Sequence, residues 1–473
     1  ISLGLVGSEM CIRDRYICLP GLLASGDIQT VSAVESKTDK NPNILVILID
    51  DAGYNDFGFM GSKEMQTPNI DALTSEGVVF TDAHVAATVS SPSRACLITG
   101  RYGHRFGYEC NLSDRTNGLP LEEETIAEVF KTNGYRTAAI GKWHLGSRDE
   151  QHPNNRGFDL FYGMKAGGRD YFYNEKKSDR PGDERNLLLN DRQVKFEKYL
   201  TDAFSEKAVE FINESSQPFM MYLAYNAVHT PMQATDEDMA KFEGHPRQKL
   251  AAMTYALDRG VGTVIRGLKD SGKFDNTLIF FLSDNGGATT NQSSNYPLKG
   301  FKGNKFEGGH RVPYFVVWKN GIPAGKPYDG LVSSLDIFAT AIDAASISKT
   351  RNRLDGVSLL PYLKGKKGEP HKVLYWRKMD TRAIRSGDYK LIITHGVDSV
   401  LYNIRRDPEE MNNLINKEPD LYRKLAKKLA KWEKNECIEP SWLEEGWRKI
   451  TNRYHQQLMH NEIKTAQDLY KKK

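Results

Sequence analysis

Cysteine is scarce in this sequence, which has only five in 473 residues: Cys11, Cys18, Cys96, Cys110 and Cys437. They are widely scattered and form neither a CxxC pattern nor a paired Cys/His spacing. These absences exclude a small scaffold held together by disulfides and argue against a structural zinc site. An apolar run of membrane-spanning length is missing too, so we expect no stable membrane insertion of the mature chain.

A large excess of charge of one sign is also absent. The formal net charge is +4, which is small for this length and gives no reason to expect a nucleic-acid partner. Hydrophobic residues make up 39% of the chain and charged residues 27%, which is typical of a globular protein. The length is sufficient for one large α/β domain and a smaller one, and there is no internal repeat.

Residues 1–40 are not expected to belong to the folded domain. Residues 1–15 resemble a read-through tag, and residues 27–40 are polar and predict a linker. Between them, residues 17–26 resemble the tail of a signal peptide with a small-residue cleavage site. This segment predicts export to the periplasm or the cell exterior, and a disordered leader is the alternative.

Acidic and amide side chains follow two buried strands of a predicted parallel sheet. The apolar run 44–49 ends in Asp50 and Asp51, and the run 277–282 ends at Ser283, followed by Asp284 and Asn285. Ligands bind at this edge of open α/β sheets, and hard oxygen donors favour Ca²⁺, with Mg²⁺ as the second candidate. The alternative for Asp50 and Asp51 is a solvated turn that caps a helix.

A serine precedes a predicted helix that ends at Gly100. Pro92 is expected in the first helical turn, which places Ser90 just outside the helix. Free backbone N–H groups there favour an anion, and Arg94 adds a positive charge one turn further on. This pattern indicates a nucleophile, but an ordinary Ser-Pro helix start fits it equally well.

Basic side chains follow two further predicted strands. Lys142 and His144 come after the strand 137–140 and are two residues apart, so they would face the same side of an extended chain. His229 follows the strand 219–225. Lysine and histidine at such places suit anion binding and proton transfer, although a lone histidine is more often structural.

These segments together resemble the type I sulfatases of the alkaline phosphatase superfamily. The resemblance rests on Ser-x-Pro-x-Arg-x-x-Leu-Ile-Thr-Gly from Ser90, on Gly-Lys-Trp-His-Leu-Gly from Gly141, and on His229 before Thr-Pro. It also includes the two acidic strand ends and the glycine-rich stretch 298–313, and it covers about residues 43–414. Family members of this kind oxidise the first residue, here Ser90, to formylglycine, which requires a maturase that accepts serine.

The resemblance also implies roles for the other residues. Calcium would be held by four side chains: Asp50, Asp51, Asp284 and Asn285. The sulfate-binding lysine falls on Lys302, with Lys299 as the neighbouring alternative, whereas Glu307, His310 and Arg311 are expected to be structural. The substrate would be a sulfated small molecule or glycan, and a sulfated carbohydrate is the expected class.

The implied mechanism begins with the hydrated formylglycine at position 90, whose hydroxyl group attacks sulfur while calcium lowers its pKa. His229 would protonate the departing alcohol. Arg94, Lys142 and Lys302 would offset the negative charge. His144 would then remove the proton from the second hydroxyl, which expels sulfate.

The predicted architecture is α/β, with a mostly parallel central sheet between helices and a smaller C-terminal α+β subdomain. We place the catalytic domain at 41–365 and the subdomain at 366–440, where short strand patterns form a small antiparallel sheet with a helix packed on it. Residues 147–199 are polar and irregular, which predicts a loop-rich insertion that contributes to substrate choice. Residues 441–473 predict a polar, solvated tail, for which a helix is an open alternative and a binding role is not expected.

Two other functions fit parts of this pattern. A metal-dependent phosphatase or phosphodiesterase of the same superfamily would use unmodified Ser90, but it usually needs a second set of metal ligands. A non-catalytic binder of sulfated glycans would not need the complete set of catalytic residues that the chain has.

Overall fold

The computed structural model describes residues 41–112 and 115–471, which belong to one compact unit. The tag, signal-peptide and linker predictions all fall on residues 1–40 and lie outside the described residues. Among the described residues, no helix is long and apolar enough to cross a membrane.

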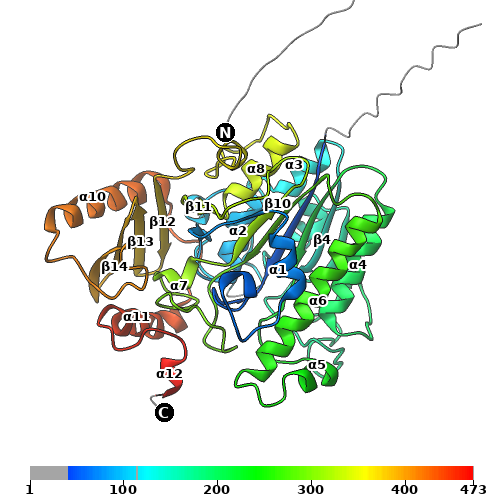
Figure 1. Cartoon of the computed structure of the whole chain (residues 1–473), viewed down its shortest axis with the longest axis horizontal. Coiled ribbons are helices and arrows are strands. Elements are labelled where there is room, and N and C mark those ends of the chain that lie inside the picture. Colours follow the sequence, from blue (N-terminus) through cyan, green and yellow to red (C-terminus); the bar gives the residue numbers. More distant parts are fainter. Residues whose placement is uncertain (1–40, 113–114, 472–473) are drawn as a thin grey trace, which may run out of the picture. The chain divides into compact units, whose positions relative to one another are not determined.

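A nine-stranded sheet forms the centre of the fold, in the order β2-β10-β9-β1-β8-β4-β5-β6-β7 (Figure 1). Its five middle strands are parallel: β9 (Thr277–Ser283), β1 (Asn43–Ile49), β8 (Phe219–Ala224), β4 (Arg136–Lys142) and β5 (Leu160–Met164). Antiparallel strands extend both edges: β2 (Val78–Val79), β10 (Tyr314–Val317), β6 (Leu188–Leu189) and β7 (Arg192–Gln193). The predicted, mostly parallel sheet is confirmed.

Helices cover both faces of this sheet. Every side chain of β1 is therefore buried. Leu45, Ile47 and Ile49 pack on one side, where α1 (Pro68–Thr74), α4 (Leu200–Glu214) and α6 (Gln248–Asp270) lie. The residues of β1 between them, Ile44, Val46 and Leu48, pack on the other side. There they meet α2 (Ser90–Thr99), α3 (Ile126–Thr132) and α8 (Asp336–Ala344). Such two-sided burial explains why the strand is a continuous apolar run.

The structure differs from the sequence pattern in two places within this domain. The segment 147–199 is not only an insertion, because it supplies β5 to the parallel sheet. The apolar spacing of residues 122–133 predicts a helix over that range, but α3 begins at Ile126. Thr125 accepts a hydrogen bond from the backbone N–H of Glu128, and the Glu128 side chain accepts one from the backbone N–H of Thr125, which caps the helix there.

A separate four-stranded antiparallel sheet follows near the C-terminus, formed by β12 (Val373–Lys378), β13 (Thr381–Ser386), β14 (Tyr389–Thr394) and β15 (Asp398–Asn403). Alternate side chains pack on opposite faces: Leu391 contacts the cluster of α10 (Pro419–Glu436), and Ile392 contacts the cluster of α11 (Glu445–Met459). The predicted small subdomain is therefore present. The domain boundaries stay a prediction.

The last segment of the chain departs from the predicted solvated tail. Residues 445–459 form α11, and Leu458, Met459 and Ile463 are almost completely buried against the small sheet. These apolar residues are few in a polar segment, so the composition gives little sign of their burial. The remaining elements are short: β3 (Ala83–His84), β11 (Val332–Ser333), α5 (Asp236–Lys241), α7 (Glu307–His310), α9 (Leu360–Leu363) and α12 (Asp468–Lys471).

Buried charges join α7 to the small sheet. Lys390 of β14 is fully buried, and its ammonium lies 2.9 Å from Glu307 and 3.0 Å from Glu410. Burial opposes the ionisation of Glu307, but Lys390 and the other cationic groups around it hold its pKa well below the usual range. Burial raises the pKa of Glu410.

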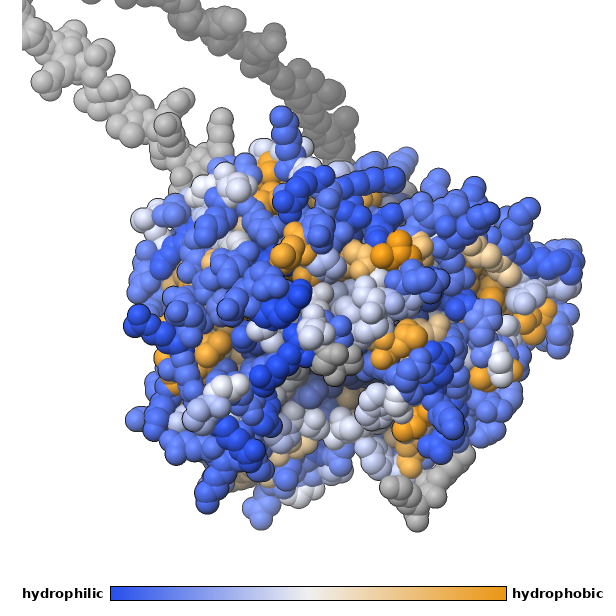
Figure 2. Space-filling view, turned by 180° about the vertical axis from the view of Figure 1, so that it is seen from behind, coloured by the Kyte–Doolittle hydropathy of each residue, from blue (hydrophilic) through white to orange (hydrophobic). Residues whose placement is uncertain are grey.

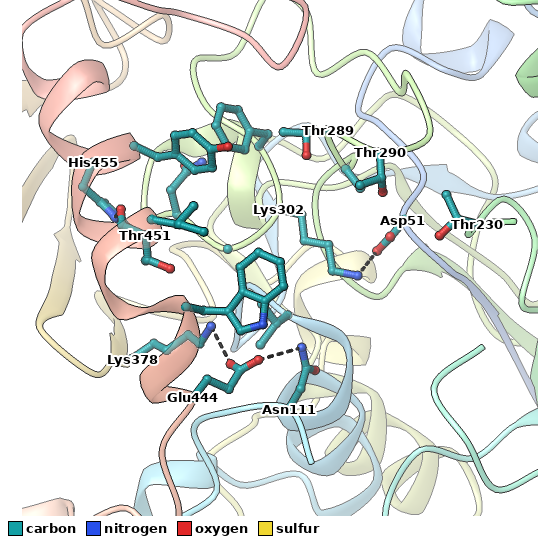
Figure 3. A pocket seen from close by; sticks show the side chains of 18 of the residues that line it. Asp51, Asn111, Thr230, Thr289, Thr290, Lys302, Lys378, Glu444, Thr451 and His455 are labelled. Atoms are coloured by element: carbon teal, nitrogen blue, oxygen red, sulfur yellow. Dashed lines mark hydrogen bonds and ion pairs between the residues drawn. The ribbon is translucent and has the colours of Figure 1, made fainter. Parts of the chain in front are cut away.

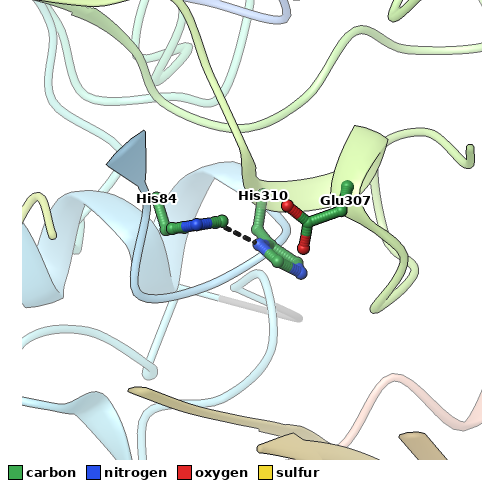
Figure 4. Close-up of side chains that lie close together, drawn as sticks. All are labelled: His84, Glu307 and His310. Atoms are coloured by element: carbon green, nitrogen blue, oxygen red, sulfur yellow. Dashed lines mark hydrogen bonds between the residues drawn. The ribbon is translucent and has the colours of Figure 1, made fainter. Parts of the chain in front are cut away.

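Two histidines complete this cluster beside Glu307 (Figure 4). The Nδ1 atoms of His84 and His310 lie 2.9 Å apart, so one ring donates a hydrogen bond to the other. The three side chains are close enough to be considered as metal ligands. However, both carboxylate oxygens of Glu307 already accept hydrogen bonds, one from Lys390 and one from Arg311, so neither lacks a partner.

We predict that Lys390→Met strongly destabilises the protein. The substitution keeps the length of the side chain but leaves buried Glu410 without its cation and Glu307 with its longer contact to Arg311, which costs about 3–5 kcal/mol of unfolding free energy. Urea denaturation measures this loss of unfolding free energy as a lower midpoint. The matched control is Arg405→Ala, which removes an exposed ion pair with Asp388 and should leave the midpoint unchanged. Equal midpoints for both variants would contradict a structural role for Lys390.

Candidate active site

Ser90 lies at the first position of α2, with Val89 as its N-cap. The sequence pattern places it one residue earlier, just outside the helix. Pro92 is in the first turn as predicted, and Gly100 ends the helix with a φ of 64°. The hydroxyl oxygen of Ser90 is 3.2 Å from a carboxylate oxygen of Asp50, 3.2 Å from Oδ1 of Asn285 and 3.3 Å from Nζ of Lys302.

The two acidic strand ends meet beside this hydroxyl group. Strands β1 and β9 are neighbours with Ile49 opposite Ser283, which brings the residues that follow them together. The backbone N–H of Asp51 donates to Asp284 over 3.2 Å, and the amide of Asn285 donates to Asp51 over 2.7 Å. The four residues of this predicted set are at most 1% exposed: Asp50, Asp51, Asp284 and Asn285.

Each of the three carboxylates has a cationic partner from a different segment of the chain. Lys142 at the end of β4 contacts Asp50 over 2.7 Å. Lys302 contacts Asp51 over 2.6 Å. Arg94 of α2 contacts Asp284 over 2.9 Å. The cluster therefore balances its charge internally, which a buried group of carboxylates requires.

The ion pairs decide the charge states within the cluster. Burial opposes the ionisation of Asp50 and Asp51, but the surrounding cations, Lys142 and Lys302 foremost, hold the pKa of each carboxyl below its usual value. Burial also opposes the charge of Lys302, yet the neighbouring carboxylates raise the pKa of its ammonium. Lys302 is therefore positively charged at neutral pH. Burial lowers the pKa of Lys142 despite its contact with Asp50.

One carboxylate oxygen of this cluster has no hydrogen-bond partner among the described residues, although it is buried: Oδ2 of Asp51. Asp50, Asp51 and His229 offer ligand atoms that all lie within 4.8 Å of one another. A buried carboxylate oxygen without a donor costs free energy unless a cation meets it. The carboxylate oxygens of Asp50 and Asp51 thus fit a hard divalent cation.

The two candidate histidines differ in their surroundings. His144 has a left-handed backbone with a φ of 56°, so it does not continue the extended conformation of β4. That Lys142 and His144 face the same side stays a prediction. Burial first, and then the nearby positive charges, lowers the pKa of His144 well below the usual value, so this ring is neutral and able to accept a proton.

His229 is partly exposed and follows β8. Its Nδ1 lies 2.6 Å from the carbonyl oxygen of Thr230, which only accepts hydrogen bonds, so Nδ1 carries a hydrogen. Nε2 faces Asp51 at 3.7 Å. This second nitrogen is the atom that can carry a proton to a leaving group.

Several residues that support the site carry no signal in the sequence. Tyr171, in the segment treated as an insertion, donates its hydroxyl hydrogen toward the carbonyl oxygens of Asn226, at 2.6 Å, and His229, at 2.9 Å. Asn291 and Ser293 donate to the backbone carbonyl of Asp51, at 3.0 and 2.9 Å. Only the fold brings these segments to the strand ends.

The two lysines offered as alternatives have different surroundings. Lys302 contacts Ser90 and Asp51, whereas Lys299 is buried and donates to the carbonyl oxygen of Glu410 at 3.0 Å and to the side chain of Asn461. Glu307, His310 and Arg311 form the buried junction described above and do not contact Ser90.

Two hollows adjoin the cluster. The first, which we call the α11 pocket, has a volume of about 370 Å³ and is lined by Asp51, His229 and Lys302 and by residues of α11 (Figure 3). The second, the His144 pocket, has a volume of about 330 Å³ and is lined by His144, Gly167 and neighbouring loops. The polar surface around the body of the protein is interrupted by scattered apolar side chains (Figure 2).

Comparison with known families identifies the class of protein. Residues 42–347 match the family model of the sulfatases, and residues 302–435 match that of the C-terminal region of N-sulphoglucosamine sulphohydrolases. The chain belongs to the type I sulfatase family and is a sulfuric ester hydrolase.

Individual relatives agree with this assignment. The chain is 36% identical over 401 residues to the uncharacterized sulfatase YdeN of Escherichia coli (strain K12), a match that covers 72% of this chain and 70% of that protein. It is 32% identical over 373 residues to the N-acetylgalactosamine-6-sulfatase of Canis lupus familiaris. This match covers 74% of this chain and 71% of that protein. The crystal structure of Ps i-CgsB in complex with k-i-k-neocarrahexaose has a TM-score of 0.80 and 38% identity, and covers 88% of this chain and 99% of that one.

We predict that Gly167→Ala lowers catalysis by displacing His144. A Cβ atom at this position would lie 2.7 Å from two atoms of the imidazole, so the ring must move. We expect kcat for an aryl sulfate to fall by about tenfold to a hundredfold, because proton transfer depends on placement. The control is Gly325→Ala, where an added Cβ meets nothing within 4 Å. Unchanged kcat for Gly167→Ala would show that the position of His144 is not critical.

Proposed function

We propose that the protein hydrolyses sulfate esters through a formylglycine made from Ser90. The observation that carries this proposal is the position of the Ser90 hydroxyl oxygen between Asp50, Asn285 and Lys302. Formylglycine in its hydrated form would supply one hydroxyl group to attack sulfur and a second one to release sulfate. Unmodified serine would end as a stable sulfate ester, so turnover depends on a maturase that accepts serine.

A calcium ion is part of the proposal, with Mg²⁺ as the second candidate. Asp50, Asp51, Asp284 and Asn285 would hold it, and the unpartnered Oδ2 of Asp51 supports this assignment. Asp284 would serve both the ion and Arg94, with which it forms an ion pair. When bound, the ion would lower the pKa of the nucleophile at position 90 and balance charge on the sulfate oxygens.

The charged residues around Ser90 would bind and orient the sulfate group. Lys302 is the best placed, because its ammonium reaches Ser90 and is partly exposed to the α11 pocket. Lys142 and Arg94 are fully buried and would act through Asp50 and Asp284, with which they form ion pairs.

Proton transfer would be divided between the two histidines. His229 would protonate the departing alcohol through Nε2, since its Nδ1 is committed to Thr230. His144 would accept the proton from the second hydroxyl group, which suits a ring kept neutral by burial and nearby cations. The two rings line different pockets, which supports separate roles for them.

The proposed substrate class is a sulfated carbohydrate. Two similar proteins support it: one is named for N-acetylgalactosamine 6-sulfate, and the other was crystallised with a neocarrahexaose. Export of the protein to the periplasm or the exterior completes the proposal and rests on residues 17–26. A phosphatase using unmodified Ser90 is less well supported. Of the two groups of metal-ligating side chains among the described residues, only that of Asp50, Asp51 and His229 adjoins Ser90.

We predict that modification of residue 90 and sustained sulfatase turnover occur together. The peptide that contains residue 90 should be lighter by two hydrogens when the protein is produced with a serine-accepting maturase. Hydrolysis of an aryl sulfate and of an aryl phosphate is then assayed in parallel, with protein produced with the maturase and with protein produced without it. The modified protein should prefer the sulfate, and the unmodified one should show no sustained turnover. Equal sulfate turnover by unmodified protein would contradict the formylglycine mechanism, and a preference for phosphate would favour the phosphatase.

A further inference from the structure

Helix α11 lies outside both regions that match a known family, which end at residues 347 and 435. Family membership therefore assigns no role to it. Its polar composition predicts nothing beyond a solvated tail. Yet residues of α11 line the same pocket as Asp51, His229 and Lys302, and Figure 3 shows Thr451 and His455 of the helix across from Lys302.

The helix is fixed to the loop that carries Lys302. His455 is completely buried, its Nε2 accepts the backbone N–H of Lys305 at 3.2 Å, and its Nδ1 donates to the carbonyl oxygen of Thr451 at 2.9 Å. The rings of Phe301 and Tyr454 meet edge to face at 5.4 Å. The pocket wall is therefore a preformed surface and not a tail that folds over the site.

The side of α11 that carries His455 also presents three apolar side chains and one threonine to the pocket. Trp447, Ile450, Thr451 and Tyr454 recur at helical spacing and all line it. Trp447 remains 57% exposed and Ile450 37% exposed, whereas Asp51 is 1% exposed. The aromatic surface thus lies toward the open side of the pocket, and the reacting groups lie deeper. Exposed apolar side chains next to a polar site are typical of a ligand surface.

Polar groups surround this aromatic surface. Glu444, which precedes the helix, pairs with Lys378 at 2.7 Å and lies 3.5 Å from the amide of Asn111. Thr289 and Thr290 line the other side (Figure 3). A sugar ring has an apolar face of C–H groups and a rim of hydroxyl groups, and this combination of an indole with carboxylate, amide and hydroxyl groups matches both.

We propose that α11 binds the sugar ring next to the sulfated one. Trp447 packs against the C–H face of that ring, and Glu444 and Asn111 bind its hydroxyl groups. This inference rests on the proposed sulfatase function and specifies its substrate: an oligosaccharide is preferred over a sulfated monosaccharide. The preference arises from a neighbouring sugar and not from the sulfate itself.

The test compares substrate lengths in the matured full-length protein. Sulfate release is measured from oligosaccharides of carrageenan, chondroitin sulfate and heparin, and from monosaccharide sulfates that carry the same ester. Trp447→Ala should lower kcat/KM for the oligosaccharide about tenfold, mainly through KM, and change the monosaccharide value less than about twofold. Trp447→Phe should recover part of the loss. The control Ile438→Ala removes an equally exposed apolar side chain outside the pocket and should change neither value.

Three outcomes would overturn this proposal. Equal losses for both substrate lengths, or no loss for either, would exclude a contact with a neighbouring sugar. A change from dimer to monomer on substitution of Trp447, with the length preference unchanged, would assign the surface to a second copy of the chain. Hydrolysis of an aryl sulfate without release from any sugar sulfate would leave the sulfatase chemistry intact and reject the carbohydrate. Failure to hydrolyse any sulfate ester would instead reject the proposed function.

Discussion

The pairing of three buried carboxylates with three buried or partly buried cations is the interaction on which the site depends. Asp50, Asp51 and Asp284 lie at adjacent strand ends, where charge without a partner would be very costly. The cations come from a helix, a third strand and a loop, so the charge balance exists only when these segments have assembled. The same pairing keeps an oxygen of Asp51 without a donor, and this oxygen is what a metal ion would meet.

The position of Ser90 follows from this charge balance. Arg94 lies one turn after Ser90 in α2 and forms an ion pair with Asp284. The ion pair that balances this carboxylate therefore also fixes the position of the Ser90 hydroxyl group relative to the cluster. Lys302 does the same for its loop, because it contacts both Asp51 and Ser90. Helix α11 in turn holds that loop through His455. The pocket wall and the reacting centre are thus parts of one packed unit.

Much of the fold could be predicted from the sequence, because the strands that form the sheet centre are continuous apolar runs and end in polar residues. Helix α6 is also predictable from the sequence, since its apolar residues recur at a regular helical period over its whole length. The residues brought together around Ser90 were also predictable, because parallel strands deliver their ends to one edge. Their roles in catalysis stay predictions.

What could not be predicted depends on backbone conformation and on distant contacts. His144 has a left-handed backbone conformation, and no residue pattern predicts it. Strand β5 was missed because its few residues include glycine and follow polar turns. The packing of α11 was missed because only a few apolar side chains anchor it, and their partners lie on other segments, such as the small sheet.

Direct measurement of calcium binding tests the central claim, that the carboxylate cluster is a charge-balanced cation site. Isothermal titration of metal-free protein with calcium should reveal one site per chain. Asp51→Asn, which keeps the shape of the side chain and removes its charge, should weaken binding by at least about tenfold. Equal affinities for the wild type and Asp51→Asn, or no binding by the wild type, would contradict the account.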